Sequence, residues 1–135
     1  MSSIQSLLTL ARDLVIALEA GDLREGFHHP IQRGSAQGSV HVLREPSADA
    51  PLLVVRLCIM PAPTRELERF LATLLELNHR FHGRAAFSLD DLGMVHLTAG
   101  RPVADLDEGE VLDLLLWTSE QADHYDDILM EAFPT

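Results

Sequence analysis

The sequence predicts an α+β domain in which helices at the N-terminus, the centre and the C-terminus pack on a largely antiparallel sheet. Three long segments carry apolar residues at helical spacing, and short segments between them alternate or run apolar as strands do. Most neighbouring strands are joined by short turns, which favours hairpins and an α-β-β-β-α-β-β-α order. The 135 residues suffice for one hydrophobic core, so we expect a single domain over residues 1–135.

The first half of the chain supplies one helix and three strands. A helix is expected over residues 3–20, with Gly21 as its stop, and a short strand near residues 27–32. GSVHVLRE alternates and predicts a strand with one inward face. LLVVRLCIM is apolar except for Arg56, which predicts a central strand covered on both faces. We expect the Arg56 charge to pair with an acid of the last helix.

The second half supplies a helix, a hairpin and a long final helix. Thr64 is expected to cap the second helix, and Gly83 to end it. RAAFSLDDLGMVHLTA predicts a hairpin whose turn is DDLG, where aspartates are favoured for backbone reasons. Asp105 or Asp107 is expected to cap the final helix.

The charge of the chain lies mostly at its C-terminal end. The formal net charge is −11, the chain contains no Lys, and residues 103–135 hold ten acids and no arginine. Such a field disfavours nucleic acid and anionic lipid and favours a basic protein partner, including one that itself binds nucleic acid. The alternative interpretation is that the acids only keep the protein in solution.

Several other classes of protein are disfavoured. No apolar run reaches the length of a membrane span, and the N-terminus lacks the features of a signal peptide. Cys58 is the single cysteine, so no disulfide framework is expected, and its place in an apolar strand indicates an inert thiol. We find no nucleophile elbow, phosphate-binding glycine loop or His-Glu-x-x-His motif. We therefore expect a cytoplasmic protein without catalytic residues or cofactor.

The final helix is more apolar than one sheet can cover. Val111 and Leu115 begin one apolar face, while Leu112, Leu116 and Trp117 widen the apolar surface of its first half. A helix that is apolar nearly all round must be buried on more than one side. Either a neighbouring helix covers this surface or a second chain does, and we favour the second chain.

The stretch LLELNHRFHGRAAFSLDDLGMVHLTAGRPVADLDEGEVLDLLL resembles the type III secretion chaperone fold, the class that includes the Tir chaperone. A Leu-Leu-x-x-Asn helix end leads into a Phe-x-Leu-Asp-x-x-Gly-x-Val-x-Leu hairpin, and a Leu-Asp loop then starts an apolar helix. The tail SEQADHYDDILMEAF is closer to the YbjN family of bacterial regulator-like proteins, which shares that fold. The resemblance covers residues 67–133 best.

The resemblance implies a non-enzymatic homodimer that binds a protein client in a chaperone-like or regulator-like role. In that fold the central helix and the adjoining strand commonly form the dimer contact. Together with the apolar final helix, this gives the following candidates for protein binding and dimerisation: Leu71, Leu74, Leu75, Asn78, Phe87, Leu89, Leu112, Leu116, Trp117 and Tyr125. The sequence identifies neither the client nor the surface that makes the dimer.

The alternative function is a metal-binding regulator or a metal-dependent enzyme. His79 and His82 are three residues apart and can share one helix face, as two ligands of one ion do. His124 and Asp127 have the same spacing within the acidic segment 123–127. Histidines and acids on an exposed helix face are also ordinary solvated surface, so the leading hypothesis remains protein binding.

Overall fold

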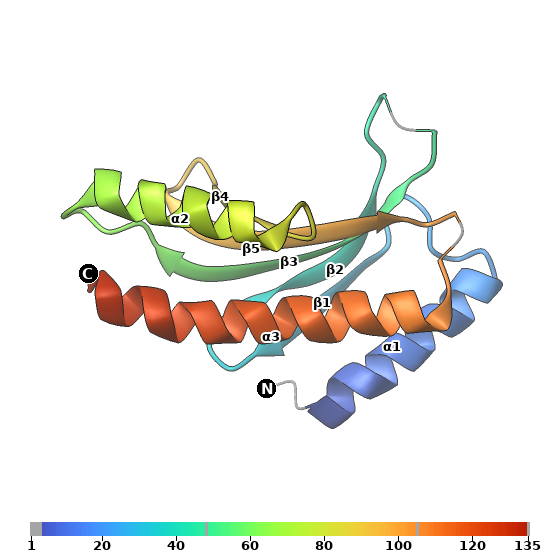
Figure 1. Cartoon of the computed structure of the whole chain (residues 1–135). Helices are drawn as coiled ribbons and strands as arrows, with labels where there is room; N and C mark the ends of the chain where they lie inside the picture. Colours follow the sequence, from blue (N-terminus) through green and yellow to red (C-terminus); the bar gives the residue numbers. More distant parts are fainter. Residues whose placement is uncertain (1–3, 48, 105, 135) are drawn as a thin grey trace.

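The computed structural model describes residues 4–47, 49–104 and 106–134 (Figure 1). Over these residues the elements follow the predicted order: α1 (Ile4–Glu19), β1 (His28–Arg33), β2 (Ala36–Leu43), β3 (Leu52–Pro61), α2 (Leu67–Phe81), β4 (Ala86–Leu89), β5 (Met94–Pro102) and α3 (Glu108–Ala132). The five strands form one sheet in the order β1-β2-β3-β5-β4, and every neighbouring pair is antiparallel. The predicted α+β class is therefore confirmed.

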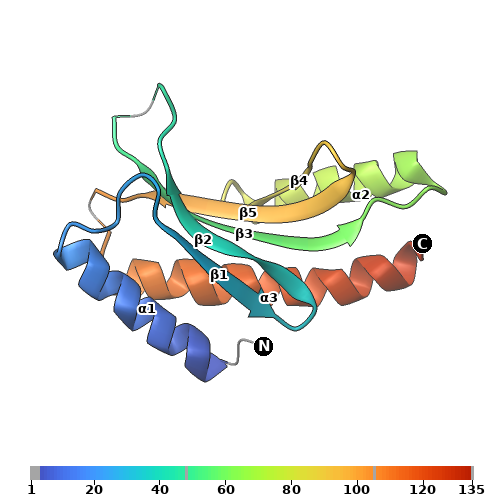
Figure 2. The same cartoon turned by 180° about the vertical axis from the view of Figure 1, so that it is seen from behind.

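The helices cover one face of the sheet. On β3, the central strand, Leu53, Val55 and Leu57 are fully buried on this face, while Arg56 points the other way and is exposed. Viewed from behind, β1 and β2 pass in front of α3 (Figure 2). The predicted cover on both faces of β3 is wrong. We call the uncovered side the open face; it carries Ser39, His41, Arg56, Cys58, His96 and Thr98.

The position of α3 also corrects the predicted partner of Arg56. Helix α3 packs across β1, β2, β3 and β5 on the covered face, so its acids cannot reach Arg56. Instead the Arg56 Nε donates a hydrogen bond of 3.3 Å to the Thr98 Oγ1 on the neighbouring strand. Since the guanidinium remains in contact with water, the strand avoids burying an unpaired charge.

Helix α3 begins with a capping box. The Asp107 carboxylate accepts from the Glu110 N–H at 2.8 Å, and the Glu110 carboxylate accepts from the Asp107 N–H at 3.3 Å. Asp107 is therefore the predicted cap, whereas the alternative, Asp105, lies outside the described residues. None of the helices in the described ranges is long and apolar enough to cross a lipid bilayer.

Helix α2 begins later than predicted. The segment before it still follows the sheet, because the Ala62 N–H donates to the Gly93 carbonyl at 2.8 Å. The helix therefore starts at Leu67 after Glu66, whose backbone is left-handed, and Thr64 does not cap it. At the other end His82 adopts the left-handed conformation and Gly83 follows, so the predicted stop is confirmed.

Both outer strands of the sheet are blocked, although by different means. On β4, the Asn78 side chain of α2 accepts from the Phe87 N–H at 2.6 Å and donates to the Phe87 carbonyl at 3.2 Å. On β1, the ladder register turns the backbone of Pro30 outward; it has no N–H, and its carbonyl accepts from the His29 Nδ1 at 2.8 Å. Exposed edge strands invite pairing with other chains, and both devices oppose it.

Candidate functional site

Four aromatic rings meet where α2, β4 and α3 come together, and we call them the aromatic cluster. Phe81 lies at its centre, with ring centroids 5.8 Å from Phe87, 5.7 Å from Trp117 and 5.8 Å from Tyr125. Phe87 and Tyr125 also meet edge to face at 5.9 Å. Phe87 is buried, whereas the other three rings are partly exposed. Edge-to-face aromatic pairs hold their geometry well, so this cluster presents a firm apolar surface.

The sequence pattern explains why these rings converge. Trp117 and Tyr125 are eight residues apart on α3 and therefore lie on nearly the same side of the helix. The structure brings together the predicted candidates Phe87, Trp117 and Tyr125. It adds Phe81, which the sequence analysis did not select. The missed signal is the inward stripe of α2, which runs Phe70, Leu74, Leu77 and Phe81 at helical spacing.

A second apolar surface lies on the face of α2 that borders its inward side, and we call it the outer stripe. It consists of Leu67, Leu71 and Leu75, spaced four residues apart along the helix. Leu75 is 69% exposed, Leu67 is also exposed and Leu71 is partly buried. Large exposed leucines in a row on one helix are unusual for a surface that meets only water.

The other predicted residues of this region have different positions. Leu74 faces inward and is buried in the core, so it supports the helix rather than its outer surface. The amide of Asn78 is occupied by the Phe87 backbone, as described above. Leu89, at the end of β4, is exposed.

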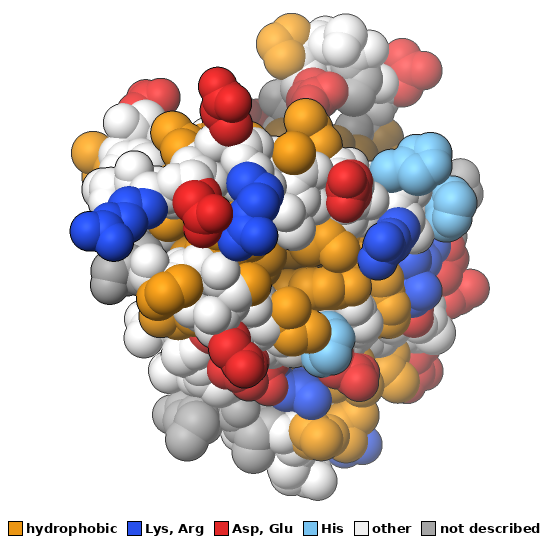
Figure 3. Space-filling model, turned by 60° about the vertical axis from the view of Figure 1, so that its left-hand side comes forward, with side chains coloured by type: hydrophobic (Ala, Val, Ile, Leu, Met, Phe, Trp, Pro, Cys, Tyr) orange, Lys and Arg blue, Asp and Glu red, His pale blue; other side chains and the backbone are white. Residues whose placement is uncertain are grey.

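The first half of α3 receives cover from its own chain. Leu112 lies against α1, where it lines a cavity of about 200 Å³ with Leu8 and Arg12. Trp117 is covered in part by Phe81 of α2, and Leu116 is partly buried. The neighbouring-helix alternative therefore accounts for part of the apolar surface of α3. Figure 3 shows one side of the molecule, on which hydrophobic side chains gather in a band among charged ones.

The structure does not assemble the metal ligands that the sequence suggested. The His79 and His82 rings are 6.1 Å apart, between centroids, at the end of α2. His124 is exposed and its ring packs edge to face on Tyr125 at 4.9 Å. Among the described residues, no group of three or more His, Cys, Asp or Glu side chains is placed to hold an ion.

Asp126 is a buried acid that the sequence analysis placed in a solvated cluster. Its side chain is 1% exposed, one carboxylate oxygen accepts from the Ser35 hydroxyl, and the other has no partner in the described structure. Burial, followed by the charges of Asp127 and Asp123, raises the pKa of Asp126 above its ordinary value. The Asp126 carboxyl thus connects the β1–β2 turn to α3. Because burial disfavours its charged form, this contact contributes less to stability when the carboxyl is ionised.

Replacing Asp126 by Asn should stabilise the protein at neutral pH. A raised pKa means that the folded state binds the proton more tightly, so the favourable contribution of Asp126 is present below its ordinary pKa and is lost as pH rises through the folded-state value. The Asp126→Asn variant is expected to raise the free energy of unfolding at pH 7 by about 1–2 kcal/mol. Urea unfolding between pH 4 and pH 8 measures this, with the exposed Glu131→Gln on the same helix as control. Parallel pH curves for wild type and Asp126→Asn would contradict the assignment.

The open face carries polar side chains with little sign of reactivity. Burial, followed by the charges of Asp90 and Asp126, raises the pKa of the Cys58 thiol, which therefore stays protonated and weakly nucleophilic. Burial, followed by the charges of Arg56 and His28, lowers the pKa of His41. The Asp90 carboxylate accepts from the Leu92 and Met94 N–H groups, which confirms its backbone role in the predicted turn.

Comparison with known proteins finds likeness only among solved structures, since no family model and no curated protein matches. A chain in the crystal structure of the ExsC–ExsE complex is 18% identical, with a TM-score of 0.62 over 90% of this chain and 93% of that chain. A chain of the heterodimeric ExoU–SpcU complex from the type III secretion system of Pseudomonas aeruginosa is 16% identical, with a TM-score of 0.53 over 90% of this chain and 97% of that chain. The type III secretion chaperone-like fold implied by the resemblance is thereby confirmed.

Proposed function

We propose that this chain is a non-enzymatic, homodimeric protein-binding module with a chaperone-like role, close to the YbjN family and acting in the cytoplasm. The observation that carries the proposal is that α2 contributes to two apolar surfaces, the aromatic cluster through Phe81 on its inward face and the outer stripe on the neighbouring face. Both similar structures are complexes of two different proteins, which supports a protein client.

The aromatic cluster is the surface that we assign to the client. Trp117 and Tyr125 are partly exposed, and aromatic side chains of this kind dominate the energy of protein interfaces. They give a large apolar contact while their polar atoms remain able to bond. Exposed acids on the same helix, Glu120 and Asp127, favour a client whose apolar segment is flanked by basic residues.

The outer stripe is the surface that we assign to the second copy. A two-fold dimer buries the same patch on both copies, so each leucine contributes twice. At 3.6 residues per turn, the stripe is centred about 90° around α2 from the inward residues Phe70, Leu74 and Leu77. Two copies can therefore pair through α2 while each keeps its aromatic cluster available.

Recovery of a client by the tagged protein tests the proposal. Tyr125→Ala and Trp117→Ala should each reduce the recovery of one specific protein by about tenfold or more, as expected for loss of an aromatic anchor. Ile16→Ala on α1 removes another exposed apolar side chain and should leave recovery unchanged. The client, once purified, should bind more weakly as salt rises from 50 to 300 mM.

Circular dichroism establishes that each variant is folded, and sedimentation that each remains a dimer. Recovery of the same protein in equal amount by wild type, Tyr125→Ala and Trp117→Ala would contradict the assignment to the aromatic cluster. Failure to recover any specific protein from the source cells would count against the client itself.

A further inference from the structure

A cavity of about 290 Å³ lies next to the aromatic cluster, where β5 and α3 meet the loop between α2 and β4. Its volume is near the lower end of the range for small-molecule sites. Arg84, Arg101 and Asp113 supply the formal charges of its lining, which sum to +1 in a protein whose net charge is −11. Trp117 and Thr118 of α3 form part of its wall.

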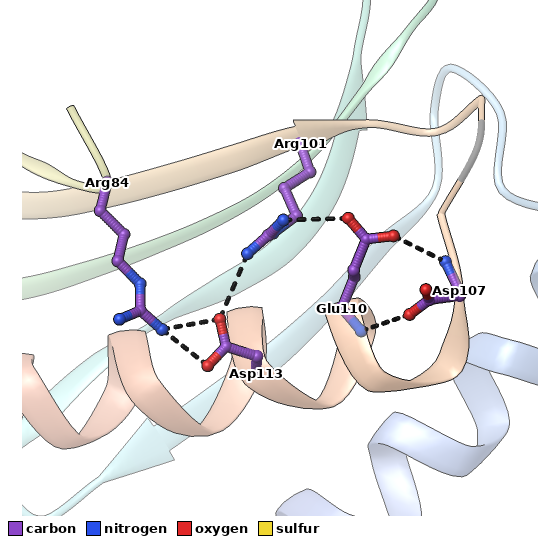
Figure 4. A network of polar contacts seen from close by, with 5 residues as sticks. All are labelled: Arg84, Arg101, Asp107, Glu110 and Asp113. Atoms are coloured by element: carbon purple, nitrogen blue, oxygen red, sulfur yellow. Dashed lines mark hydrogen bonds and ion pairs between the residues drawn. The ribbon is translucent and has the colours of Figure 1, made fainter.

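The two guanidinium groups converge on one carboxylate (Figure 4). The Arg84 Nη2 donates to both oxygens of Asp113, at 2.6 and 2.7 Å. Arg101 donates from its Nη2 to Asp113 at 3.2 Å and from its Nη1 to Glu110 at 3.0 Å. The cavity thus already accommodates one carboxylate between two arginines, which shows what chemistry its walls accept.

Part of the Arg84 guanidinium is available to bind a ligand. Its guanidinium carbon lies 3.9 Å from the centroid of the Trp117 ring, so the ring supports the flat side of the group. Only Nη2 is engaged with Asp113, and within the described part of the chain the Nε and Nη1 groups make no hydrogen bond. An arginine held flat on an indole with one edge free is oriented for a planar anion.

Thr118 adds a buried hydroxyl that lacks a partner. The side chain is 0% exposed, lies in the cavity wall, and its Oγ1 has no hydrogen-bond partner among the described residues. Leaving a buried polar group unpaired costs roughly 1–3 kcal/mol. A ligand that accepts from this hydroxyl removes that cost.

The sheet contributes a backbone group at the same place. Strand β4 pairs with β5 only as far as Ala86 opposite Thr98, and the Arg84 N–H turns away to the Phe81 carbonyl at 3.0 Å. The alternation of the antiparallel ladder then directs the N–H and C=O of Gly100 towards the position that β4 leaves empty. Gly100 lines the cavity there.

We propose that this cavity binds the carboxylate group of a ligand. The free edge of Arg84, the Thr118 hydroxyl and the Gly100 N–H supply the donors, and Arg101 supplies the second positive charge. With Glu110 paired to Arg101 as well, the charges around the cavity come close to balance, which suits a singly charged group better than a phosphate. The carboxylate comes from a small organic acid or from the C-terminus of a peptide. The site goes beyond the proposed function, since it needs no dimer and shares only Trp117 with the client surface.

Trp117 is the only tryptophan of the chain, and it reports directly on this cavity. Three probes are titrated against the full-length protein: sodium succinate, an N-acetylated Ala-Val-Ala-Ala peptide with a free C-terminus, and the same peptide as its C-terminal amide. We expect a saturable change in Trp117 fluorescence, with matching amide NMR shifts at Gly100 and Thr118, for a probe that carries a carboxylate. The more tightly bound of succinate and the free-acid peptide identifies the source of the carboxylate.

Two variants in the cavity should move the affinity in opposite directions. Asp113→Asn removes the competing negative charge and should tighten binding about fivefold, an outcome that unfolding cannot imitate. Thr118→Val keeps the shape, removes the hydroxyl and should weaken binding about fivefold. Glu120→Gln on the same helix changes the net charge as Asp113→Asn does, outside the cavity, and should leave the affinity within twofold.

The proposal is overturned if the amide probe or sodium chloride at equal ionic strength gives the same response as the carboxylates. It is also overturned if Asp113→Asn and Glu120→Gln have equal effects. The proposal is overturned as well if Trp117 fluorescence shows no saturable change up to 100 mM carboxylate.

Discussion

Replacing Leu75 by Glu should turn the proposed dimer into folded monomers. Leu75 is the most exposed leucine of the outer stripe and would be buried twice in a symmetric dimer. Losing two buried leucines at about 2 kcal/mol each weakens the dimer by about 4 kcal/mol, or roughly a thousandfold in the dissociation constant. Sedimentation equilibrium over micromolar to millimolar concentrations measures this shift, and circular dichroism should show unchanged secondary structure because the side chain is not part of the core.

Ile16→Glu is the matched control for this experiment. Ile16 lies on α1, is 59% exposed, and gives the same change from an apolar to an acidic side chain. It should leave the dissociation constant within about twofold, as expected for a surface change outside the contact. A wild-type protein that stays monomeric at these concentrations, or equal effects of the two variants, would contradict the dimer through α2.

Replacing Gly38 by Ala should cost a large part of the stability of the fold. Gly38 lies on β2 opposite Leu57 of β3, and an added Cβ would overlap the carbonyl oxygen of Arg56. That atom belongs to the backbone of the central strand and cannot turn aside as a flexible side chain does. We expect a loss of about 3 kcal/mol or more, on the order of half the stability of a typical small domain, measured by urea unfolding.

Gly100→Ala is the control, because it places the same methyl group in another strand of the sheet. Its Cβ would lie 3.4 Å from both the Leu53 carbonyl oxygen and a Val54 methyl group, so small adjustments suffice. We expect a change below about 1 kcal/mol. Similar unfolding midpoints for Gly38→Ala and wild type would show that β2 and β3 can separate at this point without cost.

The sequence was sufficient for the order of the elements, because periodicity depends on neighbours along the chain. It misled on β3, where the apolar run indicated cover on both faces. Residues such as Val54 and Cys58 lie on the open face but are apolar, so composition alone does not distinguish the two sides. Arg56 was the informative residue: strand alternation places every second neighbour of an exposed arginine on the same side.

The candidate site was only partly predictable for a related reason. Phe87, Trp117 and Tyr125 could be selected as large apolar residues, but their meeting at Phe81 depends on how α2 lies against α3. Burial of Asp126 could not be read from an acidic segment, since it results from the β1–β2 turn folding onto that helix from about 90 residues away. Contacts between distant segments leave no local pattern in the sequence.

The blocked borders of the sheet determine what kinds of assembly the molecule permits. With Asn78 filling the bonding positions beside Phe87 and Pro30 interrupting the opposite border, strands of successive copies cannot join into a continuous ribbon. Copies can instead meet through helices, and contacts of that kind close after two subunits when they are symmetric. The protein that we propose to bind apolar segments of other chains is thus itself protected from growing into fibres.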